Sequence, residues 1–317
     1  MTNTNFPNFF LVGAAKAGST SVAHYLGEHP QIYLSPIKEP NYFSRADINP
    51  NHFRELLKKR IAMFDEDKYF TTSEFTSLHA AYLTNEQHYK MLFQKADGDL
   101  VTGEASVSYL WSPTAPQEIY NANPNAKIIM VLRNPIDRAF SHYLMDLRVN
   151  FTKLSFLDAL KKDLESPYKT WNANSKYIEL GLYSEQIKRY LAIFPNQNVK
   201  IIMFDTLKKN TKQEMINLFE FLNVDSGFAP DYNKKYNESY LYKNEFVNAV
   251  SRNAKLSHFL RSILNENIKN KIRHLITTKK AIPTITADER NYLGTFFKED
   301  IAKIEILLQT NLSDWYK

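Results

Sequence analysis

The chain has 317 residues, of which 44% are hydrophobic and 23% are charged, as expected for a globular protein that can bury a sizeable core. Its formal net charge of +6 favours small anionic ligands or acidic substrates and argues against a nucleic-acid partner. The sequence contains no cysteine, which excludes disulfides, thiolate nucleophiles and cysteine-ligated metals. Its histidines lack the spacing of a zinc site, so we expect no metal.

The N-terminal apolar run, residues 9–15, is too short to cross a bilayer, and no charged region precedes it as in a signal peptide. The sequence therefore predicts a cytoplasmic protein without a transmembrane segment.

Short apolar runs recur along the chain, several of them followed by an amphipathic helical pattern, which predicts an α/β fold with a central parallel sheet flanked by helices. The first run, residues 9–12, leads through a glycine-containing turn into a helix, and a weaker run lies near residues 100–102. Lys127–Leu132 is the clearest buried strand, and the fourth run covers residues 199–204. Apolar residues at helical spacing mark the neighbouring helices: Val22, Tyr25 and Leu26 after the first run; Phe140, Tyr143, Leu144 and Leu147 after the third; Ile187, Tyr190, Leu191 and Phe194 before the fourth; Met215, Leu218, Phe219 and Leu222 after it.

Two longer excursions, residues 44–96 and 149–177, carry helical patches but no strong strand. Insertions between strands usually supply substrate specificity. Between residues 231 and 280 basic side chains outnumber acidic ones, which fits either a solvated basic face or an anion-binding surface. We expect a single domain over residues 1–317, with a core at about 7–225 and a mostly helical extension at about 226–317.

Residues 13–20 (GAAKAGST) follow the first strand and open the first helix. Their small side chains let backbone N–H groups approach an anion, and the start of the helix adds partial positive charge. Lys16 adds a full charge, and the hydroxyls of Ser19 and Thr20 can donate to the same oxygens. A nucleotide-hydrolysing P-loop has its lysine directly after the last glycine, whereas Lys16 precedes Gly18 by two residues. The pattern predicts an anion site of a different kind.

A second element, residues 133–143 (RNPIDRAFSHY), follows the clearest strand. Asn134 suits the N-cap of a helix and Pro135 its first position, so the local sequence is sound for a helix start. Arg133 at the carboxyl end of the strand and Ser141 two turns into the helix are placed to meet in the crevice where open α/β sheets bind ligands. An arginine fork can donate two parallel hydrogen bonds to a phosphate.

The loop resembles the KxGST or KGGT loop of sulfotransferases that use 3′-phosphoadenosine-5′-phosphosulfate (PAPS), and the second element resembles their RxPxDRxxSxY motif. Further segments are similar to bacterial and Golgi-type carbohydrate sulfotransferases, with Val107 where proline is usual, Ala105 where Golgi enzymes often have lysine, and Asn223 where glycine is usual. These segments are HPQI at 29–32, KEPNYF at 38–43, GEAS at 103–106 with Tyr109, GLY at 181–183, Phe194 with Pro195, and FLN at 221–223.

The resemblance implies a P-loop-NTPase-like three-layer sulfotransferase fold that binds PAPS without a metal. Sulfuryl transfer resembles phosphoryl transfer, so it needs cations at the leaving phosphate and a base for the acceptor hydroxyl. Lys16 is our candidate for charge stabilisation and Glu39 for the base, with Glu104 and His142 as rivals and Lys38 as a possible substrate contact. The implied donor-binding residues are Lys16, Ala17, Gly18, Ser19, Thr20, Arg133, Ser141, Tyr183, Lys234 and Lys235.

The acceptor predicted by this resemblance is a hydroxyl or amino group of a carbohydrate, and a lipid, a peptide tyrosine or a small natural product stays open. A P-loop kinase or nucleotidase is disfavoured by the position of Lys16. A non-catalytic protein of the same fold that binds acidic glycans is the alternative from another class.

Overall fold

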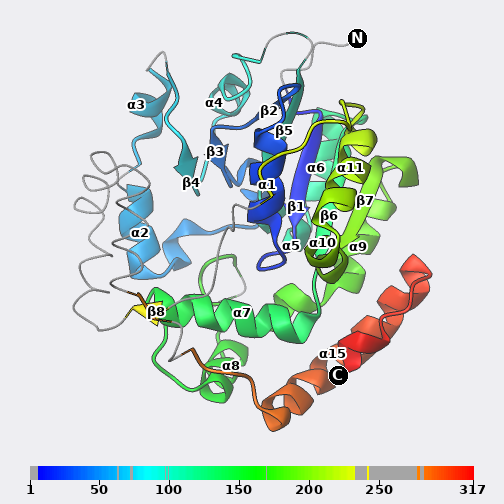
Figure 1. Ribbon diagram of the computed structural model, residues 1–317. Helices are drawn as coiled ribbons and strands as arrows, with labels where there is room; N and C mark the ends of the chain where they lie inside the picture. Colours follow the sequence, from blue (N-terminus) through cyan, green and yellow to red (C-terminus); the bar gives the residue numbers. More distant parts are fainter. Residues whose placement is uncertain are drawn as a thin grey trace.

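The computed structural model describes residues 6–62, 64–71, 74–96, 98, 100–168, 170–232, 241–242, 277–278 and 282–317. Its centre is a sheet of five parallel strands in the order β2-β5-β1-β6-β7 (Figure 1). The strands are β1 (Phe9–Gly13), β2 (Ile32–Leu34), β5 (Val101–Ala105), β6 (Lys127–Leu132) and β7 (Val199–Met203). Two short pairs lie outside this sheet: β3 (Ile37–Lys38) with β4 (Leu78–His79), and β8 (Leu241–Tyr242) with β9 (Thr277–Thr278).

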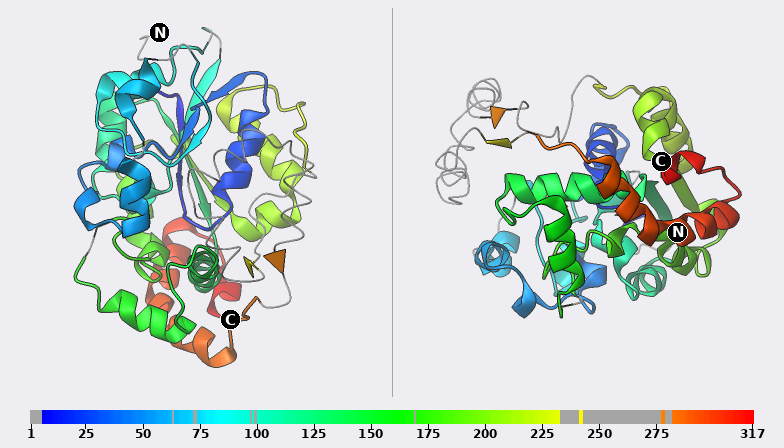
Figure 2. Two further views of the ribbon diagram at one scale, coloured as in Figure 1. Left: turned by 90° about the vertical axis from the view of Figure 1, so that its left-hand side faces the viewer. Right: turned by 90° about the horizontal axis from the view of Figure 1, so that it is seen from below.

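Helices cover both faces of the sheet. Figure 2 shows α1 and α11 on one face and α6 on the other, which gives the three layers expected. The helices are α1 (Ser19–Gly27), α2 (Glu55–Ala62), α3 (Glu66–Phe70), α4 (Glu86–Met91), α5 (Ser108–Trp111), α6 (Ala115–Ala122), α7 (Pro135–Arg148), α8 (Phe156–Leu164), α9 (Tyr183–Leu191), α10 (Phe204–Lys209), α11 (Thr211–Leu222) and α15 (Ala287–Leu308).

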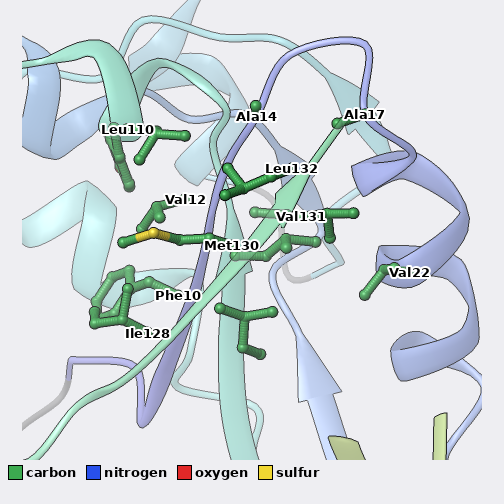
Figure 3. Packing of buried hydrophobic residues seen from close by; sticks show 14 of the residues in the cluster. Phe10, Val12, Ala14, Ala17, Val22, Leu110, Ile128, Met130, Val131 and Leu132 are labelled. Atoms are coloured by element: carbon green, nitrogen blue, oxygen red, sulfur yellow. The ribbon is translucent and has the colours of Figure 1, made fainter. Parts of the chain in front are cut away.

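The core lies between the layers, where strand side chains alternate between the two faces. Figure 3 shows Phe10 and Met130 on the same side of the strands as Leu110 of α5, whereas Val131 lies on the side of Val22 of α1. All of these side chains are buried. The C-terminal helix α15 packs against α7 and α9, so residues from the predicted extension cover part of the core. The single domain over the whole chain stays a prediction.

The strongest sequence signals gave the right elements. Lys127–Leu132 is β6 as predicted, and the helix after it starts at Pro135 with Asn134 as its N-cap, whose side chain accepts from the N–H of Ile136 at 2.9 Å. The fourth run is one residue shorter than predicted, because Phe204 begins α10.

The weak run near residues 100–102 is part of β5, an interior strand between β2 and β1. Its apolar signal is weak because Gly103 replaces a large side chain there. A Cβ at Gly103 would lie 1.9 Å from Cζ of Phe9, so the ring of Phe9 fills the space. Glycine therefore serves packing against the neighbouring strand at this position.

The apolar face predicted for α7 packs against the core. Tyr143 is buried in it, and Phe140, Leu144 and Leu147 are partly buried against it. Arg138 and Asp146, which lie on another row of the helix, are buried as well. The inner face of α7 therefore carries charge, and it faces the candidate site.

Candidate active site

Residues 13–20, predicted to bind the donor and called the donor loop below, join the carboxyl end of β1 to the start of α1. Lys16 and Gly18 have left-handed φ angles of 67° and 96°. A Cβ at Gly18 would lie 3.0 Å from ring atoms of Phe204, so glycine meets both the conformation and the close approach. Gly18 caps α1 without a side-chain hydrogen bond, so no capping side chain would compete with an anion for the first N–H groups of the helix.

Arg133 lies beside this loop, as the motif spacing predicted. Its Nη1 donates to the main-chain carbonyl of Lys16 at 3.2 Å, and its Cζ lies 4.8 Å from the centre of the Phe204 ring. Its own carbonyl accepts from the hydroxyl of Tyr183 at 3.1 Å. The ends of β1, β6 and β7 thus bring the two predicted motifs together at one edge of the sheet.

Lys16 lies in a cluster of positive charge. Burial, and then the positive charges of Arg148 and Arg133, lower the pKa of Lys16 to about 8, while Asp146 acts in the opposite direction. Like charges gathered in a partly buried place destabilise one another unless an anion joins them. This arrangement suits a phosphate or sulfate group. Ser141 is partly exposed on α7, two turns after Arg133.

Glu39 also stands at the carboxyl edge of the sheet. Its N–H donates to the carbonyl of Ala105, the last residue of β5, at 2.8 Å. Its side chain is 16% exposed, and Oε1 lies 2.7 Å from Nζ of Lys38 and 3.7 Å from Nε2 of His79. Because β5 is the neighbour of β1, Glu39 and the donor loop both lie at the carboxyl ends of the parallel strands. Lys38 is in contact with the carboxylate of Glu39.

Glu104 is fully buried in β5. The hydroxyls of Tyr89 and Tyr109 both donate to its Oε2, at 2.7 and 2.9 Å. Burial raises the pKa of Glu104 to about 7 although these hydrogen bonds act in the opposite direction. A carboxyl group enclosed in this way is badly placed to reach the proton of an acceptor.

His142 lies on the charged face of α7, with its ring against that of Tyr177 at a centroid distance of 5.4 Å. Its Nδ1 is buried without a hydrogen-bond partner among the described residues. Burial, together with the positive charges of Arg138 and Lys16, lowers the pKa of His142 to about 3, while Asp146 acts in the opposite direction. The imidazole is therefore neutral at physiological pH and a weak base.

Tyr183 is fully buried, and its hydroxyl bonds the main chain of Arg133. Its connection to the donor site therefore runs through Arg133. Lys234 and Lys235 lie outside the described residues, as does most of the basic segment 231–280. In the described part of the chain, no group of three or more His, Asp or Glu side chains is arranged to hold a metal ion.

The family model of the sulfotransferase domain matches residues 6–305. This chain belongs to the sulfotransferase domain family. The crystal structure of a sulfotransferase from Alicyclobacillus acidocaldarius is 30% identical, covers 98% of this chain and 99% of that chain, and has a TM-score of 0.73. The predicted family and the predicted three-layer fold are therefore confirmed.

Curated relatives of this sulfotransferase-domain chain include carbohydrate sulfotransferase 15 of Homo sapiens, 24% identical over 250 residues, which are 69% of this chain and 44% of the relative. The bifunctional heparan sulfate N-deacetylase/N-sulfotransferase 3 of Mus musculus is 24% identical over 312 residues, 97% of this chain and 30% of that protein. The chain thus spans less than half the length of these relatives. None of its helices, where the structure describes them, is long and apolar enough to cross a membrane.

Sequence reasoning missed three residues of this sulfotransferase domain: Phe204, which lies next to Gly18 of the loop, and Arg138 and Arg148, whose charges act on Lys16. Phe204 could have been found from its position at the carboxyl end of a predicted strand, where ligands bind in open sheets. The signal for Arg138 is weaker. Arg138, His142 and Asp146 follow one another at intervals of four residues, so these three polar residues form one row of the helix.

Proposed function

We propose that this protein transfers a sulfuryl group from PAPS to a hydroxyl or amino group of an acceptor, most simply a carbohydrate. The observation that carries the proposal is the hydrogen bond from Arg133 to the carbonyl of Lys16, because it joins two cationic motifs into one anion site. The site has one charged lysine in the loop, a guanidinium next to it and a helix start. These groups suit the phosphosulfate and the 3′-phosphate of the donor.

The donor supplies an activated sulfuryl group whose bond to the phosphate oxygen breaks as the bond to the acceptor oxygen or nitrogen forms. Lys16 stabilises the negative charge that develops on the phosphate side. Arg133 and Ser141 hold the other phosphate, so that the donor is fixed in one orientation. Glu39 takes the proton from the acceptor, since it is the partly exposed carboxylate at this edge of the sheet.

A carbohydrate acceptor is supported by the names of the curated relatives, a carbohydrate sulfotransferase and a heparan sulfate N-sulfotransferase, and by the KEPNYF segment. A lipid or a small natural product is the competing acceptor class, and binding of acidic glycans without turnover is the competing kind of function. The cytoplasmic location remains a prediction from the sequence.

The first experiment measures thermal unfolding with 3′-phosphoadenosine-5′-phosphate (PAP), the product of the donor, without added magnesium. A ligand that binds the native state raises the free energy of unfolding, by about 2.7 kcal/mol when its concentration is one hundred times Kd, and it therefore raises the melting temperature. No shift at saturating PAP would overturn the proposed donor.

The second experiment supplies labelled PAPS with a panel of glycans, lipids and small alcohols. We expect label on a glycan, and Glu39→Gln to keep PAP affinity while losing turnover. Label on a lipid alone would move the acceptor to the competing class. PAP binding without transfer to any acceptor, combined with salt-sensitive binding of acidic glycans, would favour the non-catalytic alternative.

A further inference from the structure

Arg138 is a fully buried arginine in the first half of α7, five residues after Arg133 and three before Ser141. One of its nitrogens, Nη2, donates to the main-chain carbonyl of Tyr177. The other two, Nε and Nη1, are buried without a hydrogen-bond partner among the residues that the structure describes. Buried polar groups in native proteins are nearly always paired, so two unpaired donors on one guanidinium need an explanation.

The charge of Arg138 is not balanced locally. Among the described residues no carboxylate forms an ion pair with it, and the acid whose charge acts on it is Asp163. The carboxylate of Asp163 already accepts the N–H groups of Ser175, Lys176 and Tyr177 at 2.8 to 2.9 Å. Burial lowers the pKa of Arg138 to about 10, which still leaves it charged at neutral pH. A buried cation without an ion-paired carboxylate costs stability.

The field of Arg138 reaches the donor site. Its charge contributes to the lowered pKa of Lys16 and of His142, and Arg133 in turn acts on Arg138. Inside a protein such interactions are weakly screened by solvent and salt. Arg138, Lys16 and Arg133 therefore interact electrostatically, and Arg138 is the fully buried member of the three.

We propose that Arg138 is a buried cation of the donor site whose counter-charge is the bound donor itself. Without ligand it destabilises the protein, and with the anionic groups of the donor in place it strengthens their binding. This inference rests on the proposed function. The competing explanation is a purely structural role, in which Arg138 only ties α7 to the carbonyl of Tyr177.

The two explanations predict opposite results for Arg138→Met, which keeps an unbranched apolar stem and removes the charge. If the donor is the counter-charge of Arg138, the Arg138→Met protein without ligand should melt at or above the temperature of the wild type. Its Kd for PAP should be raised roughly tenfold. A structural tie predicts a lower melting temperature and an unchanged Kd. Arg138→Lys should restore most of the affinity for PAP, because it keeps the charge.

Arg189 provides a matched control. It is a partly buried arginine on α9 whose Nη2 also donates to main-chain carbonyls, those of Leu110 and Trp111, at 3.1 and 2.9 Å. The acids that act on it are Asp47 and Glu185. Arg189→Met should lower the melting temperature and leave the Kd for PAP unchanged.

An unchanged Kd in Arg138→Met would overturn the inference. If that variant does not fold, Arg138→Gln and Arg138→Lys decide the question: weak binding by the first with near-normal binding by the second supports a role of the charge, and equal binding by both overturns it. A wild-type protein that ignores PAP would refute the proposed donor. In that case the melting temperatures without ligand still test the unbalanced charge, and a less stable Arg138→Met would overturn it.

Discussion

Nη1 of Arg133 donates to the main-chain carbonyl of Lys16 across 3.2 Å, so the arginine of one motif is oriented by the backbone of the other. The same guanidinium lies over the ring of Phe204, whose atoms would lie 3.0 Å from a Cβ at Gly18 of the loop. Each half of the donor site therefore depends on the other. A change in Phe204 should act on the site through Arg133.

This relationship predicts that Phe204→Leu weakens PAP binding about threefold to tenfold, because the ring that supports the guanidinium is lost, and that Phe204→Tyr binds PAP almost normally. Titration calorimetry on both variants, each with and without Arg133→Lys, forms a double-mutant cycle. We expect a smaller effect of Phe204→Leu once Arg133 is replaced. Strictly additive effects would show that Phe204 acts independently of Arg133.

The sheet and its site edge could be predicted because β6 and α7 have strong local signals: a continuous apolar run, then Asn134 and Pro135 at the helix start. The motif residues Lys16 and Arg133 could be assigned to one site because the carboxyl ends of parallel strands share an edge. The short edge strand β2 was not predicted. Three residues are too few for a period-two pattern to stand out.

The burial of charged residues on one face of α7 could not be predicted. A helix pattern assigns Arg138 and Asp146 to the solvent face, since charged residues are rarely buried. Their burial depends on residues 175–177 from a distant excursion, which bring the carbonyl of Tyr177 to Arg138 and a hydroxyl of the same residue to Asp146 at 2.7 Å. Local sequence carries no information about such a tertiary contact.

The lowered pKa of Lys16 predicts a pH dependence of donor binding. The free protein loses the charge of Lys16 as pH rises through about 8, so kcat/KM for PAPS and the affinity for PAP should fall above that pH. Removing a neighbouring positive charge raises the pKa of Lys16, so Arg148→Gln should move this alkaline limb to higher pH.

A pH series of kcat/KM on the wild type and Arg148→Gln checks the shift. Lys188→Ala, on the exposed side of α9, should keep the wild-type profile. If the fall in kcat/KM at alkaline pH does not move in Arg148→Gln, or if there is no fall between pH 7 and 9, then the ionisation of Lys16 does not control donor binding.

Glu104 predicts a pH dependence of stability. Burial raises its pKa from an ordinary value of 4.5 to about 7, so the native state binds more protons than the unfolded state between these two values. The stability that this group contributes is fully present below pH 4.5 and is lost as pH rises to 7. Glu104→Gln keeps an acceptor for the hydroxyls of Tyr89 and Tyr109 and removes the titration.

The free energy of unfolding of Glu104→Gln, relative to the wild type, should therefore increase by about 2.5 kcal/mol from pH 5 to pH 8. Urea unfolding at both pH values measures this difference. Glu55→Gln, whose carboxylate is 77% exposed, should show no such increase. An equal difference at the two pH values would mean that Glu104 ionises normally in the folded protein.

Gly18 and Gly294 predict opposite effects of the same substitution. At Gly18 an alanine meets both a φ of 96° and ring atoms of Phe204 at 3.0 Å, so Gly18→Ala should cost about 1 to 3 kcal/mol of stability and weaken PAP binding. At Gly294, inside α15, a Cβ would meet nothing within 4 Å. Gly294→Ala should raise stability by about 0.5 to 1 kcal/mol, since alanine loses less backbone entropy in a helix.

Thermal unfolding and PAP titration of both variants separate the two effects, because only Gly18 belongs to the donor loop. A Gly18→Ala protein with normal affinity for PAP would mean that the left-handed turn is not needed to hold the anion.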